Sequence, residues 1–257
     1  MIRFCLLGSG SKGNAIFIAS ERIRILIDNG LSFRQLKERL RTVGESVDNL
    51  SALFVTHEHS DHIQGIGTLV RNVPMPVFVT RGTADAIYRA HGNLSNVELF
   101  EAGDRIPVAD LEITSFSVSH DAVDPVNYVV SSNGTKLGVA ADLGYASKLV
   151  FSRLQGAHAL LLEANHCPDL LMKSKYPPYV KQRILSKSGH MSNREMRDFL
   201  AQLLHRDLKL VVLVHLSEEN NRPELALQSA LDVLSHTSIP VHVATQHAPT
   251  PMFEIKP

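Results

Sequence analysis

The sequence predicts a layered α/β domain in which helices cover β-sheets. Three observations support this fold class. Short apolar runs that are typical of buried strands recur along the 257-residue chain. Longer stretches with apolar residues at helical spacing lie between these runs. Hydrophobic residues make up 44% of the chain, which provides for a sizeable core and excludes a disordered protein.

The predicted strands are apolar runs bounded by polar or turn-forming residues. The first covers residues 1–8, an apolar stretch too short for a signal peptide and followed by a Gly/Ser turn. In chain order, the other predicted strands cover residues 17–18, 23–27, 53–56, 77–80, 111–118, 128–131, 137–140, 159–162 and 210–214.

The predicted helices begin at recognisable start signals. Capping boxes, in which a Ser and a Gln or Glu three residues later bond each other's backbone, predict helices after Ser32 and Ser192. Pro223 suits the first turn of a helix that runs to about residue 234. A further helix is expected over residues 63–71. Strands interleaved with helices over this length predict sheets covered by helices.

Composition narrows the class of protein. The 26 basic residues cancel 26 acidic ones, so no overall charge draws the chain to nucleic acid or membrane. No window reaches the ~18 uninterrupted apolar residues of a membrane span. Cys5 and Cys167 cannot build a disulfide framework and fit a reducing compartment. Since the sequence has no repeat or linker, we expect one cytoplasmic domain over residues 1–257, without membrane contact.

The strongest functional signal is the segment His57-Glu58-His59-Ser60-Asp61-His62, in a chain with 13 histidines. In an extended chain His57 and His59 point to the same side, because side chains alternate along a strand. Asp61 and His62 follow at the turn into the next predicted helix and can face a second position. Three imidazoles and one carboxylate at this spacing suit a pair of divalent cations. The alternative is a solvated polar turn.

Further metal-type side chains follow three other predicted strands. His120, Asp142 and His215 come just after the runs that begin at residues 111, 137 and 210. Catalytic groups on α/β proteins commonly lie where buried strands emerge. Taken singly, each is more often a satisfied polar residue, but together with the first motif they predict additional ligands.

This ligand order resembles the metallo-β-lactamase superfamily, and further segments resemble its YycJ family, also called WalJ or VicX. The segments span most of the chain and are more specific than the metal motif. They are Gly-Ser-Gly-Ser-Lys-Gly-Asn at 8–14, Glu-Ala-Asn-His at 163–166, Tyr-Val-Lys-Gln-Arg-Ile-Leu at 179–185, Gly-His-Met-Ser-Asn at 189–193 and His-Leu-Ser-Glu-Glu-Asn-Asn at 215–221. Cys167 stands where the family usually has an acidic residue, so no role is predicted for it.

The resemblance implies a four-layer αββα sandwich with a dinuclear metal site at one edge. It assigns His57, His59 and His120 to one metal. It assigns Asp61, His62 and His215 to the other, with Asp142 bridging the two. Nitrogen and oxygen ligands without thiolate are compatible with two Zn²⁺ or two Mn²⁺ ions and do not choose between them.

The resemblance also assigns roles to residues around the metals. His190 resembles the extra histidine of phosphodiesterases in the superfamily, which contacts the scissile phosphate or protonates the leaving oxygen. A surface histidine near a helix cap is the alternative. Glu163 is expected to orient a ligand histidine or His190. The glycine-rich turn at 8–14 is interpreted as structural, although Asn14 is placed to reach the metal edge. His166 is a weaker candidate for the same neighbourhood as Glu163.

A basic strip hidden by the zero net charge surrounds His190. Between residues 173 and 197, seven basic side chains stand against one acid, Glu195, and Tyr176 and Tyr179 are interleaved. The basic residues are Lys173, Lys175, Lys181, Arg183, Lys187, Arg194 and Arg197. Such a strip suits a polyanion groove, and a solvated charged surface is the alternative. Lys181, Arg183 and Asn193 are the predicted substrate-binding residues.

These features predict a metal-dependent phosphodiesterase. A hydroxide that bridges the metals is the expected nucleophile, oriented by Asp61, with His190 acting on the leaving group. The resemblance implies a DNA exonuclease that works from 5′ ends. The stretch from Asp142 to His215 is too short for the large inserted domain of related nucleases, so the basic strip is expected to hold the DNA. The alternatives are hydrolysis of a small cyclic phosphodiester or thioester, and a non-catalytic binding module.

Overall fold

The apolar runs form two seven-stranded mixed sheets in the computed structural model, which describes residues 1–94 and 96–257. The first sheet contains, in spatial order, β14 (Phe253–Ile255), β1 (Ile2–Gly8), β2 (Ala15–Ala19), β3 (Arg24–Ile27), β4 (Ala52–Phe54), β5 (Val77–Thr80) and β6 (Val97–Phe100). The second contains β13 (Val241–Val243), β12 (Leu210–Val214), β11 (Ala159–Glu163), β10 (Thr135–Ala140), β9 (Val126–Ser132), β8 (Leu111–Ser117) and β7 (Arg105–Val108).

Both sheets change from antiparallel to parallel pairing partway across. In the first sheet β14 to β3 pair antiparallel, and β3 to β6 pair parallel. In the second sheet β7 to β10 pair antiparallel, and β10 to β13 pair parallel. Parallel neighbours emerge at the same edge of a sheet, and their crossovers place helices on the faces. The carboxyl ends of β3 and β4, and those of β10, β11 and β12, are therefore brought together.

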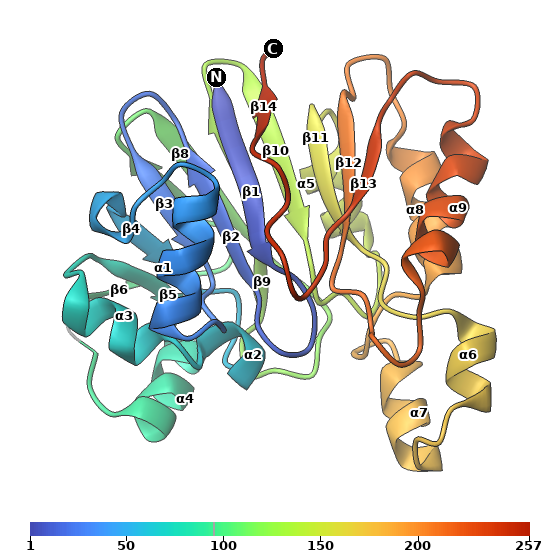
Figure 1. The fold of residues 1–257 in the computed structure, drawn as a ribbon, viewed down its shortest axis with the longest axis horizontal. Coiled ribbons are helices and arrows are strands. Elements are labelled where there is room, and N and C mark those ends of the chain that lie inside the picture. The colour runs from blue at the N-terminus through green and yellow to red at the C-terminus, as the bar shows by residue number, and fades with distance from the viewer. Residues whose placement is uncertain (95) are drawn as a thin grey trace.

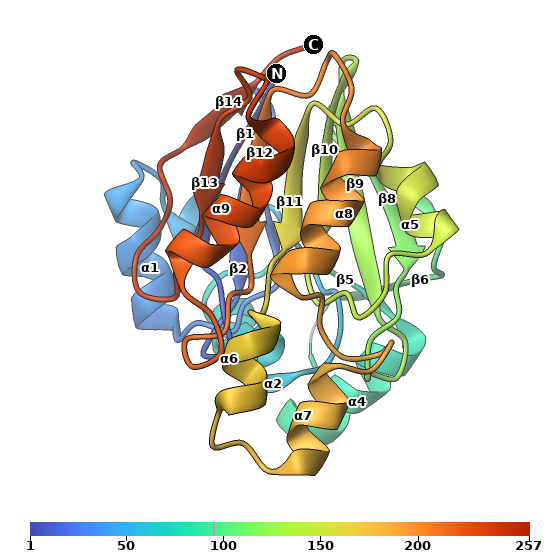
Figure 2. The same cartoon turned by 90° about the vertical axis from the view of Figure 1, so that its right-hand side faces the viewer.

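Helices cover the outer faces of the two sheets, as Figures 1 and 2 show. Those beside the first sheet are α1 (Phe33–Thr42), α2 (Ser60–Ile63), α3 (Ile66–Asn72) and α4 (Arg81–His91), with a short 3₁₀ helix, η1 (Val47–Asn49). Those on the second sheet are α5 (Lys148–Leu154), α8 (Asn193–Leu203) and α9 (Pro223–Leu234). Two further helices, α6 (Pro168–Lys173) and α7 (Pro178–Ile184), project beyond the strand ends in both views.

The core consists of three apolar layers, one between the sheets and one between each sheet and its helices. The Phe54 ring of β4 packs edge-on against the Tyr128 ring of β9, with centroids 5.7 Å apart. The buried Tyr128 hydroxyl donates to the Val55 carbonyl at 2.5 Å. Burying one large apolar side chain contributes about 1.5–3 kcal/mol, so this layer firmly fixes the segment that leads from β4 to His57. The predicted four-layer αββα sandwich is confirmed.

Most of the predicted elements are confirmed. Both capping boxes form, at Ser32 and Ser192, and α9 runs from Pro223 to Leu234 as predicted. The single helix predicted over residues 63–71 is wrong, because the chain forms α2 and α3 with a break between them. At that break the Gly65 N–H donates to the Asn29 carbonyl at 2.9 Å, outside any helix.

The elements that the sequence did not predict are short or lie at the margins of the fold. They are the edge strands β6, β7, β13 and β14 and the helices η1, α4, α5, α6 and α7. Strands of three or four residues carry too few alternating positions for a periodic signal. None of the described helices has the length and apolar character that a membrane crossing requires.

Candidate metal centre

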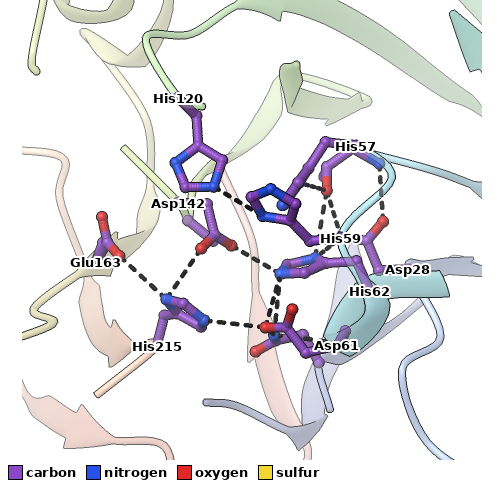
Figure 3. Close-up of polar contacts among 12 residues, drawn as sticks. Asp28, His57, His59, Asp61, His62, His120, Asp142, Glu163 and His215 are labelled. Atoms are coloured by element: carbon purple, nitrogen blue, oxygen red, sulfur yellow. Dashed lines mark hydrogen bonds and ion pairs between the residues drawn. The ribbon is translucent and has the colours of Figure 1, made fainter. Parts of the chain in front are cut away.

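The seven predicted metal ligands meet at one edge of the sandwich, where strands of both sheets end (Figure 3). The segment after β4 supplies His57 and His59, and α2 supplies Asp61 and His62. The second sheet supplies the other three beyond the ends of β8, β10 and β12, namely His120, Asp142 and His215. The two sheets therefore contribute opposite sides of one cluster.

His57, His59 and His120 form the first group, in which one nitrogen of each ring lies within 4.8 Å of the others. The Nε2 atom of His57 is buried and has no hydrogen-bond partner in the described part of the chain. The Nδ1 atom of His59 lies 3.2 Å from the Nε2 atom of His120. Without a metal, one ring can donate a hydrogen bond to the other at this distance, and a cation between the rings would instead take a lone pair from each. This arrangement fits a metal ion.

Asp61, His62 and His215 form the second group, again with ligand atoms within 4.8 Å. The Asp61 Oδ2 atom lies 3.5 Å from His62 Nε2 and 3.4 Å from His215 Nε2. Asp142 contacts this group through both carboxylate oxygens, at 2.9 Å from His62 Nε2 and 3.0 Å from His215 Nδ1. Asp142 also clusters with His57 of the first group. Buried imidazoles and carboxylates in this arrangement are a divalent-metal donor set.

Hydrogen bonds on the far ring nitrogens orient the ligand histidines. The Nδ1 atom of His57 lies 2.9 Å from the Thr56 hydroxyl, and that of His120 lies 3.1 Å from the Gly189 carbonyl. An imidazole that donates from Nδ1 keeps its Nε2 lone pair for a metal. For His120, the carbonyl partner therefore fixes the tautomer that a ligand requires.

Asp28 orients His62 through a hydrogen bond on the far ring nitrogen, and the sequence analysis did not identify Asp28 as a residue of the site. Its Oδ2 atom accepts from His62 Nδ1 at 2.8 Å and from the Thr56 hydroxyl at 2.7 Å. Its Oδ1 atom accepts the Thr56 N–H at 2.8 Å. A signal was present, because Asp28 directly follows a predicted strand, as the metal ligands of the second sheet do.

Glu163 has the predicted contacts with both a ligand histidine and His190. Its Oε1 atom lies 2.6 Å from His190 Nδ1 and 3.1 Å from His215 Nδ1. Its Oε2 atom accepts the N–H groups of Leu143 at 2.7 Å and Met191 at 3.1 Å. Burial raises the pKa of Glu163, but the charge of His190 and the hydrogen bonds with His190 and His215 outweigh burial and lower it to about 2. Glu163 is thus an ionised acceptor, and the Nε2 atom of His190 is left to face the pocket.

The backbone at the metal edge is forced into uncommon conformations. Asp28, Asp142 and His215 have φ values of 59°, 47° and 55°, in the left-handed region that side chains other than glycine rarely adopt. Each turns its side chain inward just after a strand. A Cβ on Gly30 would collide with the Asp61 carbonyl, so only glycine allows this approach. Such strain is typical of functional sites.

Four of the seven predicted metal ligands, His59, Asp61, Asp142 and His215, line a cavity of about 330 Å³. Asp61, His190 and His215 form part of its wall, and Tyr176, Arg183 and Ile184 form another part. The cavity therefore joins the metal cluster to the segment that carries α6 and α7.

The predicted substrate-binding residues separate in the structure. Arg183 lines the cavity, and its Nε atom pairs with Asp121. Lys181 instead donates from Nζ to the Met172 and Ser174 carbonyls, at 2.7 and 2.8 Å. Asn193 is 4% exposed, and its side-chain amide exchanges hydrogen bonds with Asn221 at 2.8 Å. Lys181 and Asn193 are not among the residues that line the cavity, because backbone carbonyls and a buried amide occupy their polar groups.

Asn14 reaches the metal edge as predicted, since its Nδ2 atom lies 3.0 Å from both Asp61 Oδ2 and His62 Nε2. His166 is fully buried beside this region, and neither ring nitrogen has a partner in the described part of the chain. Cys167 is a partly exposed free thiol. Neither of the last two lines the cavity.

We expect Asp28→Asn to weaken metal binding about 10- to 100-fold, the usual effect of losing a partner that orients a ligand histidine. The asparagine amide would turn an N–H toward the Nδ1 proton of His62, so the ring loses its acceptor. Isothermal titration with Mn²⁺ measures the change. Asp48→Asn, at an exposed carboxylate on η1, is the matched control. Unchanged affinity in a folded Asp28→Asn protein would contradict the orienting role.

Metal affinity should rise with pH. In the metal-free protein burial lowers the pKa of His215, but the Asp142 carboxylate and hydrogen bonds with Asp61 and Glu163 raise it to about 10. The ring is therefore protonated at neutral pH, and a metal must displace that proton. Apparent affinity for Mn²⁺ should increase by up to about tenfold per pH unit between pH 6 and 8 for each proton released. Titrations in buffers of different ionisation enthalpy count the protons, and pH-independent affinity would refute this.

Comparison with known proteins places the chain in a family. Residues 23–216 match the family model described as "Beta-lactamase superfamily domain". Exodeoxyribonuclease YycJ of Bacillus anthracis is 36% identical over 235 residues, covering 91% of this chain and 89% of that protein. Exodeoxyribonuclease WalJ of Streptococcus pneumoniae strain D39 is 34% identical over 245 residues, covering 94% and 91%.

The fold of this chain also resembles that of a solved metallo-β-lactamase-fold protein. The crystal structure of the metallo-beta-lactamase fold protein YhfI from Bacillus subtilis matches with a TM-score of 0.74 at 16% identity, covering 97% of this chain and 99% of that one. Identity this low supports the fold alone, whereas the YycJ and WalJ matches extend along nearly the whole sequence. The chain belongs to the metallo-β-lactamase superfamily and, within it, to the YycJ family.

Proposed function

We propose that this protein is a metal-dependent phosphodiesterase that degrades DNA from 5′ ends. The observation that carries the proposal is the position of His190. Its Nδ1 atom is hydrogen-bonded to Glu163, and the ring lines the same cavity as four of the proposed metal ligands. A proton donor beside a divalent-metal centre suits cleavage of a phosphodiester. Two relatives of similar length are named exodeoxyribonucleases, which supports DNA as the substrate.

The proposed cofactor is a pair of divalent ions, zinc or manganese. His57, His59 and His120 would hold one ion, and Asp61, His62 and His215 the other. Asp142 would contact both. When bound, two such ions lower the pKa of a coordinated water and neutralise charge on the phosphate under attack.

The side chains of the cavity would divide the remaining work. Asp61 accepts a hydrogen bond from Asn14, which holds its carboxylate toward the cavity, where it can orient the attacking water. Burial lowers the pKa of His190, but the adjacent Glu163 carboxylate outweighs burial and raises it above its ordinary value. A raised pKa increases the share of His190 imidazole that carries a proton. His190 can therefore donate its Nε2 proton to the leaving oxygen.

Arg183 would contact the substrate phosphate from the cavity wall, since its pairing with Asp121 engages only the Nε atom.

We also propose that residues 1–257 form a single domain and that the protein is located in the cytoplasm. The latter rests on Cys5 and Cys167, which form no disulfide within the described chain.

We predict that the metal-loaded protein converts a 5′-phosphorylated, end-labelled DNA duplex into a ladder of products with Mn²⁺ or Zn²⁺. Asp61→Ala should abolish the ladder, because it removes a metal ligand and the group that orients the water. Gel electrophoresis of the labelled products gives the direction of cleavage. Intact DNA alongside turnover of bis-p-nitrophenyl phosphate would instead assign a small phosphodiester as the substrate.

His190→Ala should lower the turnover of DNA about 10²- to 10⁴-fold, the usual contribution of a positioned proton donor. Metal content, measured by mass spectrometry of the purified protein, should stay the same because His190 is outside the proposed ligand set. His236→Ala, at an exposed histidine after α9, is the matched control. Turnover that stays at the wild-type level would exclude His190 from catalysis.

A further inference from the structure

The two helices of the α6–α7 arm, residues 168–184, bury too few side chains to add much to the stability of the fold. Helix α6 buries only Leu171, and α7 buries no side chain. Seven-residue helices are marginal in water, and most helical stability in proteins comes from packing an apolar face. A short helix that packs no buried side chain is therefore maintained by its connections to the rest of the protein. Its exposed surface is available for a partner.

Those connections hold the arm in a fixed position beside the metal centre. The Lys181 ammonium bonds two carbonyls at the end of α6, which ties the two helices together. At the end of α7 the Ile184 carbonyl accepts the His190 N–H at 3.0 Å. A Cβ on Gly189 would collide with the same turn. The Arg183–Asp121 pair adds a contact to the loop that carries His120. The arm is thus preorganised rather than a loose extension.

The exposed side of the arm combines an aromatic ring with positive charge. Tyr179 is 72% exposed, and Met172 is 62% exposed. Lys173 and Lys175 are also exposed, and the only acid within residues 168–184 is Asp169. Exposed cations and an exposed ring on one short segment are a combination with which proteins bind single-stranded nucleic acid, because bases stack on aromatic rings and phosphates pair with lysines.

The arm is continuous with the cavity. Tyr176, Arg183 and Ile184 belong to the cavity wall. Tyr179 precedes Arg183 by four residues, and residues four apart are neighbours on a helix surface, with Cβ atoms about 5–6 Å apart. Tyr179 therefore lies about one helical turn beyond the cavity wall. A DNA strand whose scissile phosphate lies near Asp61 and His190 would have to extend only that far to reach it.

We propose that the α6–α7 arm binds single-stranded DNA that extends from the metal centre, with a base stacked on Tyr179 and phosphates beside Lys173 and Lys175. This inference rests on the proposed nuclease function and gives that site its polymer-binding surface.

The test measures binding separately from cleavage. The probe is 5′-phosphorylated, 3′-fluorescein (dT)₂₀ with a phosphorothioate backbone, which resists hydrolysis, and fluorescence anisotropy gives its affinity for the metal-loaded protein. Tyr179→Ala should weaken binding about 5- to 100-fold, the range for one lost stacking contact, and Tyr179→Phe should retain wild-type affinity. Tyr88→Ala on α4, at a tyrosine that is 63% exposed, is the matched control and should bind like the wild type.

Salt dependence tests the lysines. Lys173→Gln with Lys175→Gln should reduce the slope of log affinity against log salt by about 0.7 for each phosphate contact removed. Lys37→Gln, at an exposed lysine on α1, should leave the slope unchanged. Thermal unfolding and metal content establish that each variant is folded.

The outcomes separate the two proposals. Wild-type protein that cleaves DNA, with Tyr179→Ala binding (dT)₂₀ equally well, would overturn the role of the arm and leave the nuclease function standing. Tyr179-dependent binding without cleavage of ordinary DNA would support the arm and refute the nuclease function. If Tyr179→Ala instead dissociates a dimer in size-exclusion chromatography and binds (dT)₂₀ normally, the arm is a contact between copies of the chain.

Discussion

The imidazoles of the five histidines proposed as metal ligands direct nitrogen atoms into one small space between the two sheets, and the surrounding structure is organised to hold them there. A buried polar atom without a hydrogen-bond partner lowers the free energy of unfolding by about 1–3 kcal/mol. Within the described residues, the Nε2 atom of His57 is such an atom until a cation binds. The far ring nitrogens therefore need fixed partners. The buried carboxylates of Asp28 and Glu163 supply two of them and add the negative charge that favours a cation.

The sandwich provides these positions because strands of both sheets end at the same edge. A side chain just beyond a strand end must turn inward to reach the cluster. Asp28, Asp142 and His215 do so with left-handed backbone conformations, and Gly30 allows the Asp61 loop to approach closely. This strain is offset by the apolar layer between the sheets, where Phe54 and Tyr128 pack beside the metal loop. The close packing of the core thus keeps the backbone at the metal edge in its strained conformation.

The proposed DNA-binding surface is separate from the metal cluster. The proposed metal ligands lie on helix α2 and on loops anchored to the core, whereas the α6–α7 arm presents an exposed face next to the cavity and meets it at Arg183. Glu163 links the two regions, because it contacts the ligand His215 and also His190, which follows the arm in sequence. A substrate held on the arm would in this way be positioned against the same hydrogen-bond network that orients the metal ligands.

The sequence by itself determined a layered α/β fold, its main strands and capped helices, and the seven ligand candidates, because strand periodicity, capping boxes and metal-ligand spacing are local patterns. The four-layer arrangement of the sandwich came from the resemblance to the metallo-β-lactamase superfamily. It also indicated that Glu163 lies near His190. Only the tertiary structure decided which polar side chains are free to act. Asp28 was missed because its partner His62 comes from a separate segment. Lys181 and Asn193 were predicted to bind substrate, but carbonyls of α6 and the amide of Asn221 occupy their polar groups. Hydrogen-bond partners distant in sequence leave no local pattern, and for that reason they emerge only when the chain is folded.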